Sequence, residues 1–497
     1  MINKVLVVGG GSAGFLCALG LKAKMADLDV RVIRSKDIGI IGVGEGSTLA
    51  LTNYLHGFLQ IDMRWFVRQA RPTWKLGMRY LNWGRNQYFY AFGTQIDQRL
   101  TVLPRNSAYY CLRGMQSSTP LVALMEEGKV FQRTPAGAPA WHWNLAYHFD
   151  NETFVGTLEG LCRDVGVQII DATVGEVKQN DAGISGLVMD SGQTLSADLY
   201  VDCSGFGSLL LGKTLKEPFV SFKSSLFCDR ALVGGWDRTD EPIQPYTTGE
   251  AMDCGWAWRI ELERRINRGY VYSSSFTSDD VVEAEFRRKN PKIGATRIVK
   301  FISGRYERGW VKNVVALGNA EGFVEPLEAT ALGVIAGRSR LLAEILMESG
   351  RKVPPSHVEL YNKHHVKLWD SIRRYLAMHY KHNPQMHTPF WNACRNDVDL
   401  AGVEYAIEHY RQCGPSSLFG PLLVDPTDVF GTAGYLTSFI GHEIPTNAEY
   451  QPTTQEQAIW DAERQKNRAA AMQGFTVTEA LAALPPPPSS GMPRMVM

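Results

Sequence analysis

Three short segments of this 497-residue chain hold residues whose types and spacing suit chemistry. The glycine-rich turn VVGGGSAG (Val7–Gly14) is of the kind that binds a dinucleotide. The segment TWKLGMRYLNWG (Thr73–Gly84) supplies one ammonium group, on Lys75. The segment GNAEGFVEPLEATALG (Gly318–Gly333) supplies the carboxylate of Glu328. The pattern indicates a dinucleotide site and, elsewhere in the chain, a cation and an anion that could act on a substrate.

The glycines of the first segment have separate roles in a strand–turn–helix unit. Gly9 makes the tight turn, Gly11 lets the backbone approach a pyrophosphate, and Gly14 lets the helix pack closely on the strand. Ser12 and Ala13 lie between them and belong to the predicted cofactor site. The helix that follows presents free N–H groups and the positive end of its dipole to a phosphate. The alternative is a glycine turn that binds no ligand.

The end of the second strand departs from the usual dinucleotide pattern. An acidic residue normally stands there and binds the ribose hydroxyls, but this chain has Arg34 followed by Ser35. Either Ser35 or the backbone takes the role of the acidic residue, or Arg34 contacts a phosphate of the cofactor. The sequence leaves these alternatives open.

Two further turns at strand ends favour FAD over NAD. They are Asp202–Gly205 and Gly318–Ala320, and both lie far along the chain from the glycine-rich turn. Such dispersed contacts fit a long cofactor held by a discontinuous domain. The sequence has no second GxGxxG unit for NAD(P)H, so we expect the flavin to be reduced by another protein.

The elements that must position these residues can be predicted from periodicity. Strands are expected at Lys4–Val8 and Val30–Ile33, with a helix over Phe15–Met25 between them. Leu199–Ser204 and Val314–Leu317 are predicted to be strands that end at glycines, and Ala329–Glu348 is predicted to be a helix. The region of about 85–280 is predicted to be rich in short alternating strands such as Gly269–Phe276. Ser356 to Arg411 is predicted to be helical.

Composition argues against several functional classes. A formal net charge of +1 argues against a nucleic-acid surface or a polybasic membrane anchor. No uninterrupted apolar run is long enough to predict a transmembrane helix. The eight cysteines form no CxxC pair, which fits a reducing cytoplasm. No metal site is predicted, because the histidines between 357 and 382 lack ligand spacing and are read as one polar helix face.

In these segments the sequence resembles the flavin-dependent halogenases of the tryptophan-halogenase type, from Met1 to about Trp391. The matching stretches are GGGSAG (Gly9–Gly14), IGVGEGS (Ile41–Ser47), TWKLG (Thr73–Gly77), LAYHFD (Leu145–Asp150), ADLYVDCSGFGSLL (Ala197–Leu210), GWAWRIEL (Gly255–Leu262), GYVYSSSFTSDD (Gly269–Asp280), GNAEGFVEPLEAT (Gly318–Thr330) and LAMHY…HTPFW (Leu376–Trp391).

The resemblance implies an α/β fold with an FAD-binding Rossmann-like domain of the aromatic-hydroxylase type. It further implies an inserted β-sheet and a mostly helical C-terminal substrate region. We divide the chain into a discontinuous FAD-binding domain (1–350) with an inserted strand-rich region (about 85–280), a helical substrate-binding region (351–472) and a flexible proline-rich tail (473–497).

The same resemblance assigns roles to particular residues. Reduced FAD, O₂ and chloride or bromide form hypohalous acid. Lys75 either hydrogen-bonds this oxidant or becomes a haloamine, and delivers an electrophilic halogen to an aromatic ring. Glu328 stabilises the cationic ring or accepts its proton, which agrees with the need for a negative charge near an arenium ion. The backbone N–H groups of Thr330 and Ala331 hold the halide. The remaining predicted cofactor contacts are Val43, Gly44, Glu45, Gly46, Asn319 and Leu332.

Three positions depart from the family pattern. Trp256 and Trp258 of the WxWxIP motif, which lie between flavin and substrate, are retained, but Glu261 replaces the proline. Ala329 and Ala331 replace a common serine and glycine. The carboxylate of Glu261 either lies at the edge of the site without effect on the reaction or alters the channel between flavin and substrate. These changes motivate an alternative, a halide-independent flavin monooxygenase, and a third hypothesis is a flavin-binding protein without catalysis.

The expected partners are a separate flavin reductase, in transient contact or supplying FADH₂ by diffusion, and a small aromatic substrate with an indole- or phenol-like ring. The chain is expected to be a monomer or a homodimer in the cytoplasm. Residues that could stack on the ring lie in the C-terminal region: Trp391, Tyr405, Tyr410, Phe419, Phe430, Tyr435 and Trp460. Each of these rings could instead belong to the core, and Gly414–Gly434 is expected to be a loop-rich lid.

Overall fold

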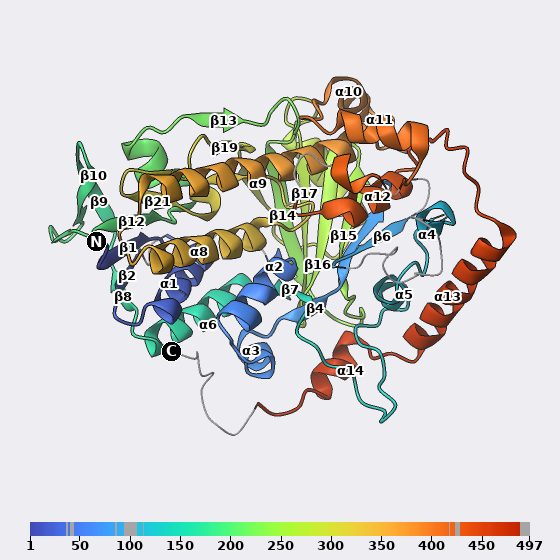
Figure 1. Ribbon diagram of the computed structural model, residues 1–497, viewed down its shortest axis with the longest axis horizontal. Helices are drawn as coiled ribbons and strands as arrows, with labels where there is room; N and C mark the ends of the chain where they lie inside the picture. The colour runs from blue at the N-terminus through green and yellow to red at the C-terminus, as the bar shows by residue number, and fades with distance from the viewer. Residues whose placement is uncertain are drawn as a thin grey trace.

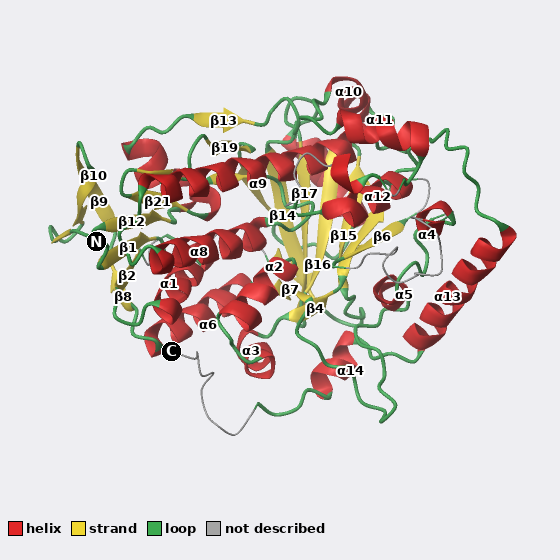
Figure 2. Cartoon of the chain, in the orientation of Figure 1, coloured by secondary structure: helices red, strands yellow, loops and turns green. Residues whose placement is uncertain are grey.

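The computed structural model describes residues 1–35, 38–39, 44–84, 87–93, 107–112, 114–416, 418–422 and 428–487. The predicted cofactor contact Val43 lies outside the described residues. Helices and strands alternate through most of the chain, and the last third is helical, as Figure 2 shows. The predicted α/β class with a helical C-terminal region is thus confirmed.

A six-stranded sheet carries the glycine-rich turn. Its strand order is β20-β21-β12-β1-β2-β8, and all neighbours are parallel except β20 and β21. The strands are β1 (Lys4–Val8), β2 (Asp29–Arg34), β8 (Gln168–Asp171), β12 (Leu199–Asp202), β20 (Trp310–Val311) and β21 (Val314–Ala316). The four predicted strands of this unit are confirmed. The central strands β1, β12 and β21 are buried on both faces and mostly apolar, whereas the edge strand β8 begins and ends with exposed Gln168 and Asp171.

Helices cover one face of this sheet, and a small antiparallel sheet covers the other. The helices are α1 (Ser12–Lys24), α6 (Asn151–Asp164) and α8 (Ala331–Glu348), and they pack together in Figure 1. The small sheet is formed by β9 (Val174–Asn180), β10 (Gly183–Met189) and β11 (Thr194–Leu195). Alternate residues of β1 point to the two sides, so Val5 and Val7 join the core under the helices, while Leu6 and Val8 join the core under β10.

A seven-stranded sheet forms the second large layer, in the middle of Figure 1. Its order is β18-β14-β17-β16-β15-β5-β6, antiparallel except for the pair β15 and β5. The strands are β5 (Gly77–Leu81), β6 (Tyr88–Ala91), β14 (Arg230–Asp237), β15 (Tyr246–Met252), β16 (Gly255–Glu261), β17 (Arg265–Tyr272) and β18 (Arg297–Lys300). Helix α7 (Asp279–Lys289) packs on one face, and the C-terminal helices pack on the other.

Two three-stranded sheets connect these layers. One has the order β3-β7-β4 and consists of β3 (Glu45–Gly46), β4 (Thr73–Lys75) and β7 (Ala146–Phe149). The other has the order β13-β19-β22 and consists of β13 (Phe219–Ser221), β19 (Gly304–Tyr306) and β22 (Gly322–Phe323). In the first sheet, β7 pairs with both outer strands, so the segment that contains Glu45 lies near the strand that ends at Lys75.

The remaining elements are mostly helical. The described part of the C-terminal region contains α9 (Pro355–Lys381), α10 (Pro389–Asp397), α11 (Glu404–Cys413), α12 (Gly431–Gly441) and α13 (Thr454–Met472), and α14 (Val477–Ala482) follows them. Short helices connect the N-terminal strands: α2 (Leu49–Thr52), α3 (Met63–Ala70), α4 (Ser107–Tyr110) and α5 (Pro120–Glu126). Single turns of 3₁₀ or π type stand at Asn53–Phe58, Gly205–Gly207, Leu209–Thr214, Gly318–Ala320 and Gly420–Leu422.

The prediction of one polar histidine face on α9 is wrong for two of its histidines. His365 and His379 are completely buried, whereas His357 is not. Both buried rings belong to a row with helical spacing of three and four residues: Tyr361, His365, Trp369, Ile372, Leu376 and His379. The first part of this row packs against Trp310 of β20 and Arg338 of α8, and its end packs against Tyr80 of the seven-stranded sheet, so these histidines are core residues.

An ordered helix also stands where a flexible tail was predicted. Helix α14 (Val477–Ala482) begins with a complete capping box between Thr476 and Glu479. Just before it, Phe475 forms a backbone bridge with Phe131. The tail prediction is therefore wrong for this stretch. No helix among the described residues is long and apolar enough to cross a membrane.

Candidate active site

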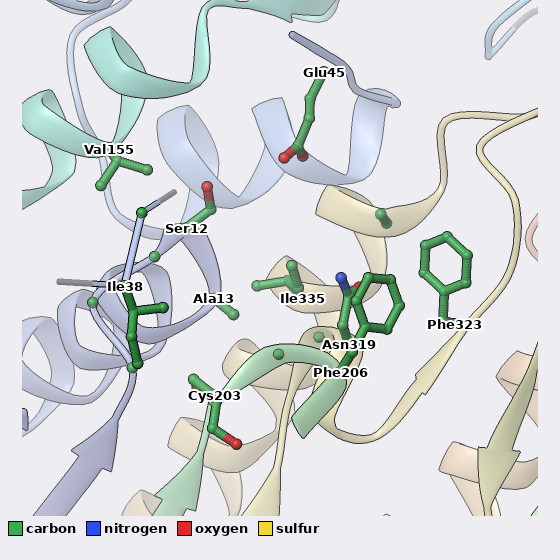
Figure 3. Close-up of a pocket in the computed structure, with 18 of the residues that line it drawn as sticks. Ser12, Ala13, Ile38, Glu45, Val155, Cys203, Phe206, Asn319, Phe323 and Ile335 are labelled. Atoms are coloured by element: carbon green, nitrogen blue, oxygen red, sulfur yellow. The ribbon is translucent and has the colours of Figure 1, made fainter. Parts of the chain in front are cut away.

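A cavity of about 860 Å³ opens between the six-stranded and seven-stranded sheets. Its walls come from elements far apart in sequence: the turn after β1, the turn after β12, the turn Gly318–Ala320 and the start of α8. Figure 3 shows Ser12 and Ala13, Cys203 and Phe206, and Asn319 and Ile335 surrounding this space. The sequence prediction of dispersed contacts around one site agrees with this arrangement.

Gly9, Gly11 and Gly14 are each glycine for a different steric reason. Gly9 has φ +125°, and a Cβ there would overlap the carbonyl oxygen of Cys203. A Cβ on Gly14 would overlap the carbonyl oxygen of Gly9, so close packing of α1 on β1 needs glycine. Gly11 lines the cavity and has open space beside it, which leaves its backbone accessible to a ligand.

Arg34 is held by two carboxylates at the cavity wall. It forms ion pairs with Glu159 of α6 and, at 2.7 Å, with Asp171. Ser35 accepts a hydrogen bond of 2.8 Å from Thr173. Glu159 also lines the cavity and was missed in the sequence, because it comes from a helix 125 residues away. The acidic group near the end of β2 is therefore present, but another element supplies it.

The segment Gly44–Gly46 joins the cavity to Lys75. All three residues line the cavity, and burial raises the pKa of Glu45 to about 7, although the Asn151 amide donates a 2.9 Å hydrogen bond to its carboxylate. A Cβ on Gly46 would lie 3.2 Å from Nζ of Lys75 and 3.4 Å from Cβ of Ala329. Lys75 itself does not line the cavity, so Gly46 separates the two.

Lys75 is completely buried at the end of β4. Among the described residues its Nζ has no hydrogen-bond partner, and it lies 4.9 Å from the centre of the Phe92 ring. Burial lowers the pKa of Lys75 to about 7, against a smaller opposing effect of the charge on Glu328. An ammonium in this position can lose or donate its proton near neutral pH.

Glu328 is also completely buried, in the loop between the turn Gly318–Ala320 and α8. Burial raises its pKa to about 8, although Tyr80 donates a hydrogen bond to Oε1 and Lys75 lies within electrostatic range. Nε2 of His379 lies 3.0 Å from the same Oε1. The sequence did not identify Tyr80 or His379, because the two come from β5 and α9, far apart in the sequence, and their rings stack together only in the fold.

The start of α8 lies between Glu328 and the cavity. Ala329 and Ala331 line the cavity, as does Asn319, whereas Thr330 and Leu332 do not. Ala329 has φ +54°, a strained value for a residue with a Cβ, and Ala331 does not share it. The N–H groups of Thr330 and Ala331 belong to the first turn of the helix, where N–H groups have no partner within the helix. Such a turn attracts anions.

The two motif tryptophans occupy different places on β16. Trp258 lines the cavity, and its ring crosses β17 where Gly269 has no side chain. Trp256 is buried and donates a 2.9 Å hydrogen bond from Nε1 to Glu325. The hydroxyl of Tyr380 donates to the same oxygen of Glu325, and burial raises the pKa of that carboxyl to about 7.

Glu261, which replaces the motif proline, is a buried ion-pair partner. Its carboxylate accepts hydrogen bonds of 2.6 Å from Arg238 and from Arg259. Two guanidinium groups therefore balance the charge that the sequence placed near the channel, which supports the alternative without effect on the reaction. Among the described residues, no three histidine, cysteine or acidic side chains are grouped to hold a metal ion.

Comparison with known proteins agrees with this architecture. The sequence profile of the family described as Tryptophan halogenase matches residues 4–458. Tryptophan 7-halogenase KtzQ of Kutzneria sp. (strain 744) is 31% identical over 463 residues, covering 86% of this chain and 85% of that protein. The crystal structure of MibH, a lathipeptide tryptophan 5-halogenase, has a TM-score of 0.87 at 36% identity, covering 97% of this chain and 93% of MibH. Xcc4156, a flavin-dependent halogenase from Xanthomonas campestris, has a TM-score of 0.84 at 26% identity, covering 98% of this chain and 100% of Xcc4156. The chain therefore belongs to the tryptophan halogenase family of flavin-dependent enzymes.

Proposed function

We propose that this enzyme uses FADH₂, O₂ and chloride or bromide to halogenate an electron-rich aromatic ring through Lys75 and Glu328. One observation carries the proposal: a fully buried ammonium and a fully buried carboxyl lie in electrostatic range of each other beside the cavity. Gly46 connects the first group to the cavity, and Ala329 connects the second.

The cavity walls fit FAD in a Rossmann-like domain of the aromatic-hydroxylase type. The open backbone at Gly11 and the N-terminus of α1 would hold the pyrophosphate. The carboxylate of Glu159, held by Arg34, would reach the ribose. When bound and reduced, this cofactor supplies the chemistry that turns O₂ and halide into hypohalous acid. The first N–H groups of α8, on Thr330 and Ala331, would hold the halide beside it.

Lys75 is suited to receive the oxidant. A neutral amine can accept an electrophilic halogen, and an ammonium can donate a hydrogen bond to the oxygen of hypohalous acid. A pKa of about 7 makes both forms accessible near neutral pH. The dry surroundings, with Phe92 beside Nζ, keep water from competing for the oxidant.

Glu328 is suited to act on the ring. Attack of the electrophile forms a cationic arenium ion, and Glu328 can either stabilise its charge when ionised or take up its proton. The proton of the attacked carbon must then leave, and Oε2 of Glu328 has no partner among the described residues. The carboxyl group thus has one oxygen held by the protein and one available to the substrate.

An indole ring is the preferred substrate group, with a phenol ring next. KtzQ and MibH act on tryptophan according to their names, and MibH is described with a lathipeptide. We therefore expect a tryptophan-like ring, either free or within a peptide, and a separate flavin reductase as the transient partner. Chain regions 1–350 and 351–472 would serve as the FAD-binding and substrate-binding parts.

The test is a panel of free tryptophan, indole, phenols and tryptophan-containing peptides. Each is incubated with FAD, a reductase, NADH, O₂ and bromide or chloride, and product is read by mass. A product with the mass shift of the halogen is expected for at least one arene. Lys75→Ala is expected to lower its yield at least about 100-fold while FAD binding is unchanged. Equal yields from the variant and the wild type would overturn the assignment of Lys75.

The same panel separates halogenation from halide-independent oxygenation. The replacement of the motif proline by Glu261 was one reason to consider a monooxygenase, and this reason is weaker because Arg238 and Arg259 balance the charge of Glu261. An oxygen mass shift that appears without halide would favour the monooxygenase. A strict requirement for halide would favour the halogenase.

A further inference from the structure

Behind Glu328, on the side of the C-terminal helices, two buried histidines form a chain of contacts. Nδ1 of His379 lies 2.8 Å from Nε2 of His442, and Nδ1 of His442 lies 3.0 Å from the backbone oxygen of Trp83. At the other end, Nε2 of His379 faces Oε1 of Glu328 at 3.0 Å. The chain therefore runs from the carboxyl group through two imidazoles to a carbonyl group.

The carbonyl of Trp83 determines where the protons lie. A carbonyl oxygen only accepts, so Nδ1 of His442 must carry a proton. Neutral His442 then has a lone pair on Nε2, and Nδ1 of His379 must donate to it. Neutral His379 consequently presents a lone pair, not a proton, to Glu328. This arrangement suits a protonated Glu328, whose proton can move onto Nε2 of His379.

Packing holds the His379 ring in place for this exchange. The ring stacks on Tyr80 with centroids 5.1 Å apart and meets Tyr375 edge-on at 5.0 Å. In the unliganded chain the angles between Nε2 and Oε1 do not satisfy a full hydrogen bond, although the distance does. Contacts of catalytic groups commonly align only when substrate is bound.

We propose that His379 is a positioning residue that takes the proton from Oε1 of Glu328 while Oε2 of Glu328 receives the proton of the halogenated ring. The proposal rests on the halogenase function and on the role of Glu328. The C–H bond of the arenium ion breaks and its proton bonds to Oε2. The O–H bond at Oε1 breaks and its proton bonds to Nε2, so the positive charge passes from the ring to the imidazole. As product leaves, the extra proton passes to the water that enters.

Without His379, Glu328 would have to ionise before it could accept a proton. Several other titratable groups surround the pair from β4, β5, β6, α9 and the end of α12: Lys75, Tyr80, Tyr88, Tyr90, Tyr375, His382 and His442. Burial raises the pKa of each of these tyrosines and lowers the pKa of both histidines. Burial also lowers the pKa of His379 to about 3, so its imidazole is neutral before the ring proton arrives and does not keep the proton afterwards. Only Lys75, with a pKa of about 7, titrates in the same range as Glu328. Its effect cancels when a variant is compared with the wild type at each pH.

The test variant is His379→Gln, which keeps hydrogen-bonding atoms but cannot take a proton. Bromination of whichever arene of the panel the wild type accepts is measured from pH 6 to 9, as product formed per hypobromous acid produced. The ratio of variant to wild type is expected to rise about tenfold per pH unit below the pKa of Glu328 and to level off above it. A ratio that does not change with pH would overturn the proposal. His387→Gln, at an exposed position on the loop after α9, is the matched control and should give a ratio near one.

A second measurement does not depend on turnover. In full-length protein labelled with ¹⁵N-histidine, His379 should show a protonated Nδ1 and an unprotonated Nε2 whose chemical shift changes in Glu328→Gln. An imidazole protonated on Nε2 and unchanged in that variant would overturn the proposal. If the wild type halogenates no arene, the proposed function fails separately, and the ¹⁵N spectrum still decides whether the Glu328–His379 proton exchange exists.

Discussion

At the scale of single residues, Gly46 separates the cavity from the ammonium group of Lys75. It lines the cavity, and a Cβ added to it would lie 3.2 Å from Nζ of Lys75 and 3.4 Å from Cβ of Ala329. Its backbone needs no positive φ, so only the absence of a side chain is required there. We infer that hypohalous acid passes this glycine on its way from the cavity to Lys75.

Replacing Gly46 with valine should close this passage. FAD binding and the rate of reduced-flavin consumption are measured in parallel, because Gly46 also lines the cofactor cavity. The yield of halogenated arene per flavin consumed should fall about 10- to 100-fold, and hypohalous acid should appear in a solution trap instead. Gly337→Val is the matched control, since Gly337 on α8 has free space around it and does not line the cavity. An unchanged yield in Gly46→Val would show that the oxidant takes another route.

Single residues could be predicted from the sequence where a local motif contains them. The three glycines of the turn, Lys75 and Glu328 are each read from a few neighbouring letters, and the structure places all of them at or beside one cavity. Glu159 and His379 could not be read in this way. Each is brought to its partner by the packing of another helix, and nothing in the local sequence of either shows that contact.

At the scale of elements, the buried carboxyl group of Glu325 links the loop before α8 to strand β16 through a hydrogen bond from Trp256. Glu325 receives hydrogen bonds from Trp256 and Tyr380, and its Oε2 has no partner among the described side chains. This contact ties the loop that carries Glu328 to the central sheet. The carboxyl is costly to ionise there, which is why its pKa is about 7.

The free energy of unfolding should therefore depend on pH through Glu325. Below pH 4.5 Glu325 is protonated both folded and unfolded. Between pH 4.5 and 7 only the folded state keeps the proton, so Glu325 lowers the free energy of unfolding as pH rises, by about 3 kcal/mol in total. Glu325→Gln removes this term, so its Tm relative to wild type should increase from pH 5 to 7 and then stay constant. Glu359→Gln, at an exposed ion pair on α9, should show no such trend. A parallel pH dependence of Tm in Glu325→Gln and wild type would contradict the assignment.

Elements were predicted well where periodicity decides them and less well where polar residues are buried. The strands Lys4–Val8 and Leu199–Asp202 are apolar runs, and they pair in parallel although they lie far apart in the sequence. The buried face of α9 was misread because His365 and His379 are polar letters within an apolar row. Helix α14 was missed because its proline-rich neighbours dominate the composition around it.

At the scale of the whole molecule, the last described residues brace the strand that ends at Lys75. The N–H of Phe475 donates a 2.8 Å hydrogen bond to the carbonyl of Phe131, and the N–H of Val130 donates a 2.7 Å hydrogen bond to the carbonyl of Phe475. The ring of Phe131 meets Trp74 edge-on at 5.1 Å, and Trp74 directly precedes Lys75. The C-terminal segment packs against the first third of the sequence, because Val477, Ala480 and Leu484 share one hydrophobic core with Trp74 and Phe131.

Ending the chain at Met472 should therefore cost both stability and activity. The truncation removes Val477, Ala480 and Leu484 from the core, together with the 2.7 Å hydrogen bond from Arg68 to the backbone of Leu484. We expect the free energy of unfolding to fall by about 2–5 kcal/mol, since comparable core deletions cost this much. The yield of halogenated product should fall further than FAD binding, because Lys75 loses its support while the glycine-rich turn does not. The control ends the chain at residue 487, which keeps every one of these contacts, and should match the full chain in Tm and yield. If both truncated proteins behave alike, the C-terminal helix has no part in holding Lys75.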